Sequence, residues 1–302
     1  MSLTPTRWPA RVVALAAAVC WPFPAAGQEP FFPNVTIAGS RAECVSVTRA
    51  SGLLEYRYRV VNPSTSDAGV NSLAVDASAP LGMTPDLLPT SGLFIGDVTK
   101  VASKATAGHV PVGMDLPSQW RGLILENGMI RWRAPGEGLK SADPIPPGGS
   151  RQDLVLRSSY LPGVRPFELL PDYPHVCCPY RPGDPRNETI QVRTPEDFRS
   201  VGLTIGPTYA PDDVTVPLTR DLLDAACQNN WITQPGVCHS LQVKLDNASA
   251  ALARGNPGAA REQLQALLDE LEAQHGPEPG KHVTDNGYWL LKINVEQLVS
   301  RL

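Results

Sequence analysis

Hydrophobic and polar residues alternate along several short segments in the first two thirds of the chain. Residues 54–61 carry Leu, Tyr, Tyr and Val at the even positions, with mostly charged residues between them, and residues 73–77 and 153–156 also alternate. This period of two is typical of a β-strand with one buried face. The aromatic residues are accordingly expected in a core rather than on a carbohydrate-binding platform. They are Tyr56, Tyr58, Trp120 and Trp132.

Residues 123–132 predict a β-hairpin. Two apolar runs flank the pair Asn127-Gly128, which tolerates the positive φ angles of a tight hairpin turn. Further strands are expected at residues 44–47, 190–192 and 201–205. Short strands that follow one another without intervening helices indicate an antiparallel β-sandwich, which we place at residues 34–206.

The apolar pattern changes to a helical period after residue 234. Apolar residues then recur at spacings of three and four in three stripes, which predict three amphipathic helices. The stripes are Leu241, Leu245, Ala248 and Leu252; Ala260, Leu264, Leu267 and Leu271; and Tyr288, Leu291, Val295, Leu298 and Leu302.

Residues that favour helix ends stand at the borders of these stripes. Those at the starts are Pro235, Asn256, Pro257 and Thr284, and those at the ends are Gly255 and Gly276. Proline suits the first helical position, Asn and Thr suit the N-cap, and glycine suits the residue after a helix. The predicted fold class is therefore mainly β plus α. An antiparallel β-sandwich is followed by a linker at 207–217 and a small C-terminal antiparallel helical bundle at 218–302.

Several short runs in this helical region carry a family resemblance. They are Gly-Val-Cys-His-Ser-Leu at 236–241, Lys-Leu-Asp-Asn-Ala at 244–248, Ala-Arg-Gly-Asn at 253–256, Gln-Leu at 263–264 and Tyr-Trp-Leu-Leu at 288–291. Residues from about 220 to 302 resemble the FIMAH domain, a C-terminal helical module of exported bacterial proteins. The resemblance implies an accessory role outside the cell and no catalytic residue. The remainder, with Trp132 and the run Pro146–Ser150, resembles an uncharacterised β-rich domain of exported proteins.

The N-terminus has the organisation of a secretory signal peptide. Arg7 and Arg11 precede an apolar run, residues 12–20, that is too short to span a membrane. The small residues Ala-Ala-Gly at 25–27 suit a cleavage site, so a signal peptide of residues 1–27, cleaved near Gly27, is predicted. The mature chain is expected to be secreted or periplasmic.

Charge and composition limit the partners of the mature chain. Removing residues 1–27 takes away two arginines and no acidic residue, which changes the formal net charge from -4 to -6. A mildly acidic chain is poorly suited to nucleic acid or to an anionic membrane surface. We therefore expect no nucleic-acid partner. No other apolar stretch is long enough to predict a membrane span.

The predicted mature chain contains five cysteines, and cysteines in an oxidising compartment tend to pair. Cys227 and Cys238 flank the start of the first predicted helix and are expected to form a disulfide that stabilises the bundle. Cys44 is expected to pair with Cys177 or Cys178. The alternative is a disulfide between Cys177 and Cys178, with Cys44 left as a thiol.

Residues 160–186 contain seven prolines and predict a long surface excursion from the sandwich. Long ordered loops often carry function, so His175, Cys177 and Cys178 form the candidate site of the chain. These three side chains cannot complete a tetrahedral metal site, and no residues at metal-ligand spacing accompany them. We expect neither a metal nor another cofactor.

Three functions fit these features. The first is an exported, non-catalytic modular protein whose sandwich binds or scaffolds an extracellular ligand such as a carbohydrate or a protein. The second is a secreted hydrolase of polysaccharide or protein, with a site that sequence motifs do not reveal. The third is a thiol- or metal-dependent protein that uses the loop at His175–Cys178. The chain has no G-x-S-x-G, H-E-x-x-H or P-loop motif, which favours the first function.

Overall fold

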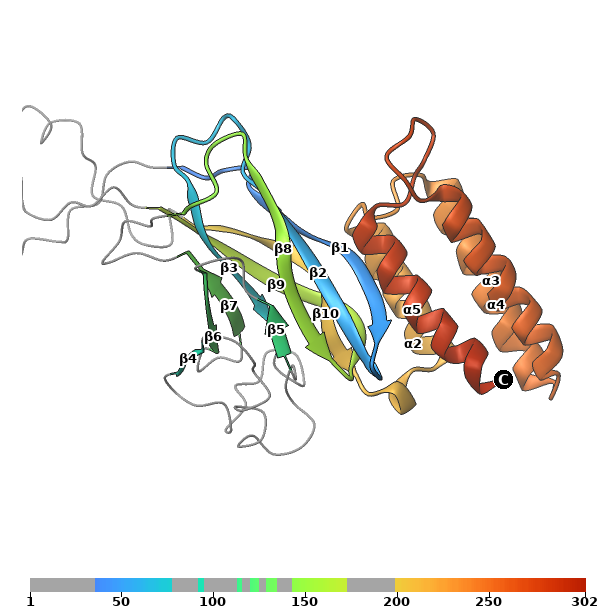
Figure 1. The fold of residues 1–302 in the computed structure, drawn as a ribbon. Coiled ribbons are helices and arrows are strands. Elements are labelled where there is room, and N and C mark those ends of the chain that lie inside the picture. The colour runs from blue at the N-terminus through green and yellow to red at the C-terminus, as the bar shows by residue number, and fades with distance from the viewer. Residues whose placement is uncertain are drawn as a thin grey trace, which may run out of the picture.

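A computed structural model shows a β-sandwich beside a bundle of helices (Figure 1). The residues that it describes are 36–77, 92–94, 113–115, 120–124, 129–134, 143–172 and 199–302. Within these ranges ten strands form two antiparallel sheets, and four α-helices follow the last strand. The structure confirms the predicted fold class of an antiparallel sandwich followed by a helical bundle.

The two sheets contain four and six strands. The four-stranded sheet has the order β1 (Arg41–Ala50), β2 (Leu53–Val61), β8 (Ser150–Ser158) and β5 (Gly113–Asp115). The six-stranded sheet has the order β10 (Ser200–Tyr209), β9 (Leu161–Pro171), β3 (Val70–Asp76), β7 (Met129–Arg133), β6 (Arg121–Ile124) and β4 (Gly92–Phe94). Strands β1 and β10 are therefore edge strands, and each has a sheet partner on one side only.

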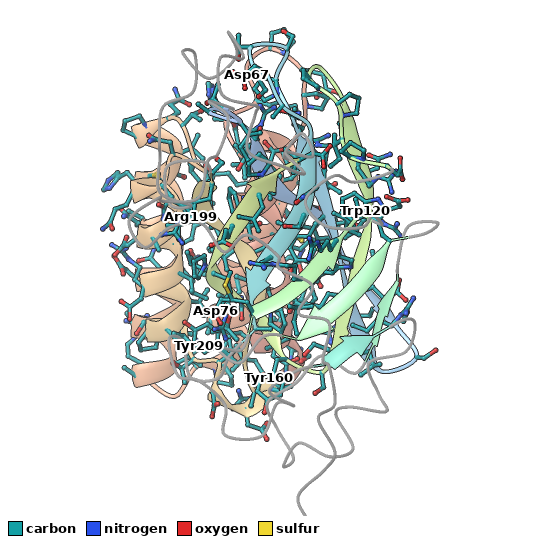
Figure 2. All side chains as sticks on the ribbon, turned by 90° about the vertical axis from the view of Figure 1, so that its left-hand side faces the viewer. Asp67, Asp76, Trp120, Tyr160, Arg199 and Tyr209 are labelled. Carbon is teal, nitrogen blue, oxygen red and sulfur yellow. A yellow bond between two sulfur atoms is a disulfide. The ribbon has the colours of Figure 1, made fainter. Side chains whose placement is uncertain are left out.

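The alternating residues predicted to be buried form the sandwich core. Tyr56 and Tyr58 on β2 are completely buried, and the ring centroid of Tyr58 lies 5.6 Å from that of Trp132 on β7. Trp120, which Figure 2 labels, is also buried. Its indole Nε1 donates to the backbone oxygen of Asp143. These aromatic side chains belong to the core, as predicted, and are not available as a carbohydrate-binding platform.

The predicted hairpin is confirmed for its two strands. β6 and β7 pair antiparallel from Arg121 opposite Arg133 to Ile124 opposite Ile130. The Asn127-Gly128 turn between them lies outside the described residues, as does the strand expected at 190–192.

The prediction of a surface excursion is wrong for its first part, because Leu161–Pro171 form strand β9 between β10 and β3 of the six-stranded sheet. Proline lacks the N–H that a strand offers to its neighbour, so it is tolerated where one side of a strand has no partner. Pro162 and Pro166 precede the stretch that pairs with β3, and β9 pairs with β10 alone there. The count of prolines therefore misled the prediction, since their positions are compatible with a strand.

The helical region contains the three predicted helices and one more. They are α2 (Val216–Gln228), α3 (Pro235–Ala253), α4 (Pro257–Gln274) and α5 (Asp285–Arg301). The predicted N-caps are confirmed for α4 and α5, where Asn256 Oδ1 accepts from the N–H of Ala259 and Thr284 Oγ1 from that of Gly287. Helix α2 was not predicted as a helix, and its first two residues, Val216 and Pro217, lie in the segment expected to be a linker. Pro217 lies in the first turn, where its missing N–H costs nothing.

The segment predicted as a linker is packed against the last helix. Its first residues complete β10, and Pro211–Asp213 form a short 3-10 helix. Val214 is completely buried, and its carbonyl accepts a hydrogen bond of 2.9 Å from Arg301 Nη1 at the end of α5. This segment therefore joins the sandwich and the bundle through direct contacts, while the predicted domain boundary within it stays a prediction.

Candidate functional site

Helix α5 lies beside α2, between the sandwich and the outer helices α3 and α4 (Figure 1). The stripe predicted from the sequence, with Tyr288, Leu291 and Val295, is buried. A second set of α5 residues is buried as well, and we call it the docking face. It consists of Asn286, Trp289, Leu290, Ile293 and Asn294, with Trp289 partly buried. A helix that is buried on most of its circumference has neighbours on more than one side.

The docking face supplies hydrogen-bond partners to the open edge of β1. The pairing of β1 with β2 shifts between Cys44 and Ser46, so Val45 has no opposite residue in β2. The Cys44 N–H donates to Asn286 Oδ1 at 2.9 Å, and Trp289 Nε1 donates to the Val45 carbonyl at 2.8 Å. Side chains of α5 thus satisfy backbone groups that an outer strand otherwise exposes.

The same face reaches strands β9 and β10 of the other sheet. Asn294 Nδ2 donates to the Pro162 carbonyl at 2.9 Å, and Thr204 Oγ1 donates to Asn286 Oδ1 at 3.2 Å. Asn286 and Asn294 are 5% and 0% exposed. A buried amide is costly without hydrogen-bond partners, so these bonds specify one position of α5 on both sheets.

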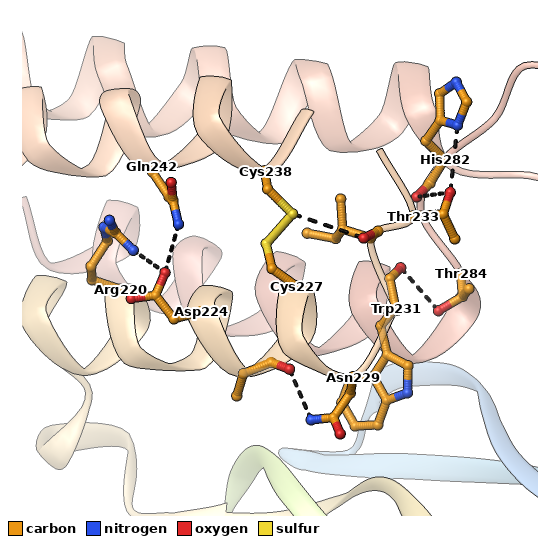
Figure 3. The surroundings of a disulfide bond; sticks show 12 residues. Arg220, Asp224, Cys227, Asn229, Trp231, Thr233, Cys238, Gln242, His282 and Thr284 are labelled. Carbon is orange, nitrogen blue, oxygen red and sulfur yellow. Dashed lines mark hydrogen bonds and ion pairs between the residues drawn. A yellow bond between two sulfur atoms is a disulfide. The ribbon is translucent and has the colours of Figure 1, made fainter. Parts of the chain in front are cut away.

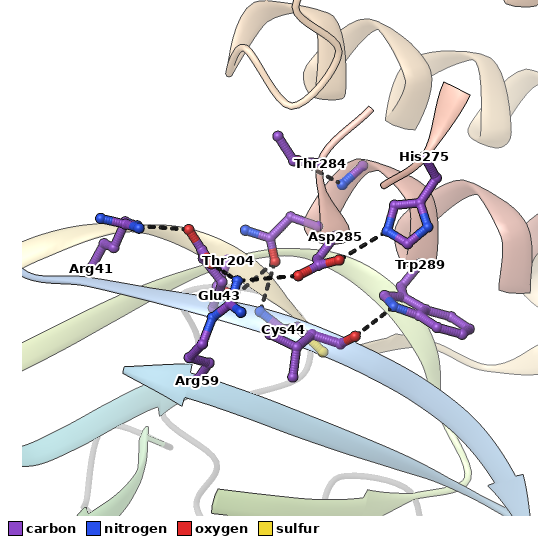
Figure 4. Close-up of polar contacts among 12 residues, drawn as sticks. Arg41, Glu43, Cys44, Arg59, Thr204, His275, Thr284, Asp285 and Trp289 are labelled. Atoms are coloured by element: carbon purple, nitrogen blue, oxygen red, sulfur yellow. Dashed lines mark hydrogen bonds and ion pairs between the residues drawn. The ribbon is translucent and has the colours of Figure 1, made fainter. Parts of the chain in front are cut away.

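A cluster of charged side chains lies at the start of α5, where this interface meets solvent (Figure 4). Asp285 at the start of α5 contacts Arg59 at 3.4 Å and His275 Nε2 at 2.9 Å, and Arg59 also contacts Glu43 at 2.7 Å. The His275 ring stacks on Tyr288 with 3.9 Å between centroids. Partly exposed ion pairs are each worth about 0–1 kcal/mol, so they orient the helix more than they stabilise it.

The structure contains the predicted disulfide between Cys227 and Cys238. It joins the end of α2 to the first turn of α3 and closes a loop that contains Trp231 (Figure 3). The Trp231 carbonyl accepts from both the N–H of Thr284, at 2.9 Å, and its hydroxyl, at 3.2 Å. Since Thr284 is the N-cap of α5, the disulfide-closed loop is bonded to the start of the docking helix.

Cys44 lies beneath this interface as a completely buried thiol. Its Sγ donates to the Ser46 carbonyl, and burial raises the pKa of the thiol far above its usual range. A thiol with these properties is unsuited to nucleophilic chemistry. The expected partners Cys177 and Cys178, with His175, lie outside the described residues, so their pairing and their role as a site stay predictions.

Other surfaces in the described part of the chain show no assembled chemical site. No three His, Cys, Asp or Glu side chains there are grouped closely enough to hold a metal ion. An open groove between α4 and α5 is lined by both apolar and charged residues, among them Leu268, Glu272 and Lys292. Lys292 is paired with Glu296 at 3.1 Å. None of the described helices has the length and apolar character needed to cross a membrane.

Residues 216–300 match the FIMAH domain. The match begins at the first residue of α2 and ends in the last turn of α5, so the FIMAH domain of this chain includes all four described helices. The FIMAH resemblance of the helical region is confirmed, while the resemblance of the remainder to an exported β-rich domain stays a prediction. A search of curated proteins found no match to the chain.

The residues that join the FIMAH domain to the sandwich were not identified from the sequence. Asn286 and Asn294 are polar positions on a buried face of α5, which is a signal of buried hydrogen bonding. Their backbone partners on the sandwich, Cys44 and Pro162, lie 242 and 132 residues away in the sequence. The apolar residues Leu290 and Ile293 beside the predicted stripe also indicated a second buried face.

We predict that Asn286→Ala lowers the free energy of unfolding by about 1–3 kcal/mol, because it leaves the Cys44 N–H and the Thr204 hydroxyl without an acceptor. Urea denaturation measures the change. Gln297→Ala is the control on the same helix, since the side-chain hydrogen bond of Gln297 within the described residues is an exposed one of 3.5 Å from Arg49. The control is expected within about 0.5 kcal/mol of the native chain. Equal losses in the two variants would contradict the assigned role of Asn286.

Cys44 is expected to make the folded chain less stable at alkaline pH. Its folded pKa is raised by burial, so the native thiol keeps its proton where the unfolded thiol ionises. This contribution to the free energy of unfolding is fully present below about pH 8.5, the pKa of an unfolded thiol. Above that pH it falls by about 1.4 kcal/mol per pH unit. Urea denaturation at pH 7 and 9.5 should show a smaller alkaline loss for Cys44→Ala than for the native chain. An identical loss in both would indicate that Cys44 is bonded to Cys177 or Cys178.

Proposed function

We propose that this chain is an exported, non-catalytic modular protein whose β-sandwich binds or scaffolds an extracellular ligand. In this proposal the FIMAH domain is an accessory that is held in one orientation on the sandwich. The observation that carries the proposal is the docking face of α5, where Asn286 bonds to β1 and β10 and Asn294 bonds to β9. Such contacts hold the two parts in one arrangement, which suits a scaffold.

The position of α5 also restricts where a ligand binds. The side of the sandwich at β1 and β10 is occupied by the docking helix, and the core aromatic residues are buried. The ligand surface is therefore expected on the sandwich away from β1. A carbohydrate or a protein is the proposed ligand class, and the acidic net charge of -4 disfavours nucleic acid.

Export of the chain is supported by two independent features. The disulfide between Cys227 and Cys238 is of a kind that forms and persists in an oxidising compartment. Residues 1–27 have the charge and apolar pattern of a signal peptide, followed by the small residues of a cleavage site. Together they support a secreted or periplasmic location.

Expression of the full chain in a bacterial host tests the proposed export. Mass spectrometry of the protein in the periplasm or medium should show that cleavage follows Gly27. Leu15→Arg places a charge in the apolar run and should retain the uncleaved chain in the cytoplasm, whereas Ala16→Leu keeps the run apolar and should be exported. Cytoplasmic accumulation of the native, uncleaved chain would contradict the proposal.

Binding and turnover can be measured on the same mature protein. It is incubated with insoluble chitin, cellulose and peptidoglycan and with immobilised surface proteins of the bacterial expression host. Both the protein retained on each probe and the products released from it are recorded. We expect retention on one of these without soluble sugars or peptides, because the protein is proposed to be non-catalytic. The heat-denatured chain is the control for nonspecific adsorption. Release of products would favour the secreted hydrolase, and the absence of retention on every probe would contradict the proposed ligand classes.

A further inference from the structure

The loop closed by the disulfide lies directly against the first turn of α5. This loop, residues 229–234, connects α2 to α3, and Figure 3 shows its Thr233 beside His282. The Thr233 N–H donates to the His282 carbonyl at 2.8 Å. A Cβ added to Gly287 would lie 2.8 Å from the Trp231 carbonyl oxygen, closer than real Cβ contacts allow. The first turn of α5 therefore packs on the loop so tightly that a side chain at 287 has no room.

The same turn of α5 carries the contacts to the sandwich. Thr284 is bonded to Trp231, and the next two residues, Asp285 and Asn286, contact Arg59 and the Cys44 N–H. A continuous set of contacts thus runs from the disulfide through Trp231 and Thr284 to Asn286 and β1. Few residues separate these points, so a displacement of the loop is transmitted to the docking face.

We propose that the Cys227–Cys238 disulfide controls the docking of the FIMAH domain on the sandwich. When the disulfide forms, it closes loop 229–234, the loop positions the start of α5, and Asn286 and Trp289 reach β1. When it is reduced, the loop regains freedom and the start of α5 loosens on β1, while the paired strands of the sandwich stay folded. Docking then depends on the redox state of the compartment.

The chemistry is thiol–disulfide exchange with a small-molecule disulfide. The thiolate of one cysteine attacks the small disulfide and forms a mixed disulfide, which releases one small thiol. The thiolate of the other cysteine then attacks the protein sulfur of the mixed disulfide and releases the second small thiol. Two protein thiols are oxidised and one small disulfide is reduced to two thiols. The timing rests on the proposed export, because a reducing cytoplasm keeps both thiols free until the chain leaves it.

Hydrogen exchange of single amides in the purified mature chain, followed by NMR, tests this proposal. The reporter is the Cys44 N–H, which donates to Asn286, and the reference amides lie in β8, whose neighbours are β2 and β5. Reduction by dithiothreitol, verified by a thiol count, should raise the exchange rate of Cys44 by about tenfold or more and leave the β8 amides unchanged. Glutathione disulfide should then restore the slow exchange.

Three variants separate docking control from general stabilisation. Cys227→Ser with Cys238→Ser should show fast exchange at Cys44 without reductant. Gln242→Ala is the matched control, because it removes another contact between α2 and α3, the bond of 2.7 Å to Asp224, and leaves the loop closed. Its exchange should equal that of the native chain. Gly287→Ala should give fast exchange at Cys44 with the disulfide intact, since its methyl group displaces Trp231, although alanine favours helix.

Unchanged exchange at Cys44 after complete reduction, or in Gly287→Ala, would overturn the proposal. Loss of protection in β8 together with Cys44 would also overturn it, because the disulfide would then stabilise the whole chain rather than the docking alone. Gly287→Ala decides the question if the serine variant does not fold. The measurements use purified protein, so a failure of docking control is distinguishable from a failure of export.

Discussion

The open edge of strand β1 is the constraint on which the arrangement of this protein depends. An outer strand presents backbone N–H and C=O groups that must be paired, bonded to water or covered. Here the Cys44 N–H and the Val45 carbonyl are bonded by Asn286 and Trp289 of α5. The helix thereby does for β1 part of what a neighbouring strand would do, and it prevents another chain from pairing at this point.

This constraint explains why the FIMAH domain is not a loosely attached module. Helix α5 belongs to the bundle through one buried stripe and to the sandwich through its docking face, so the two hydrophobic cores are continuous. The segment after β10 is held by Arg301 and the buried Val214, and the start of α5 is held by the disulfide-closed loop. Contacts at both ends of α5, through Thr284 and Arg301, therefore determine how the helix is held.

A rigid attachment has consequences for function. In the proposed function, the accessory domain covers one side of the sandwich and leaves its other surfaces to a ligand. It also links the interface to the disulfide between Cys227 and Cys238, because the loop that this disulfide closes bonds to Thr284 of α5 through the Trp231 carbonyl. The burial of Cys44 under the same helix makes its thiol part of the interface rather than a reactive group.

The sequence by itself determined the local elements, because periodicity, caps and turn residues act over a few positions. The alternation at Tyr56 and Tyr58, the caps at Asn256 and Thr284, and the pairing of Cys227 with Cys238 were all predicted from neighbouring residues. The prolines of β9 misled the prediction because their tolerance depends on which strand edge lacks a partner. Tertiary structure alone decided that Asn286 meets Cys44, which lies 242 residues earlier. A hydrogen bond across such a separation is specified by the packing of whole elements and leaves no local pattern in the chain.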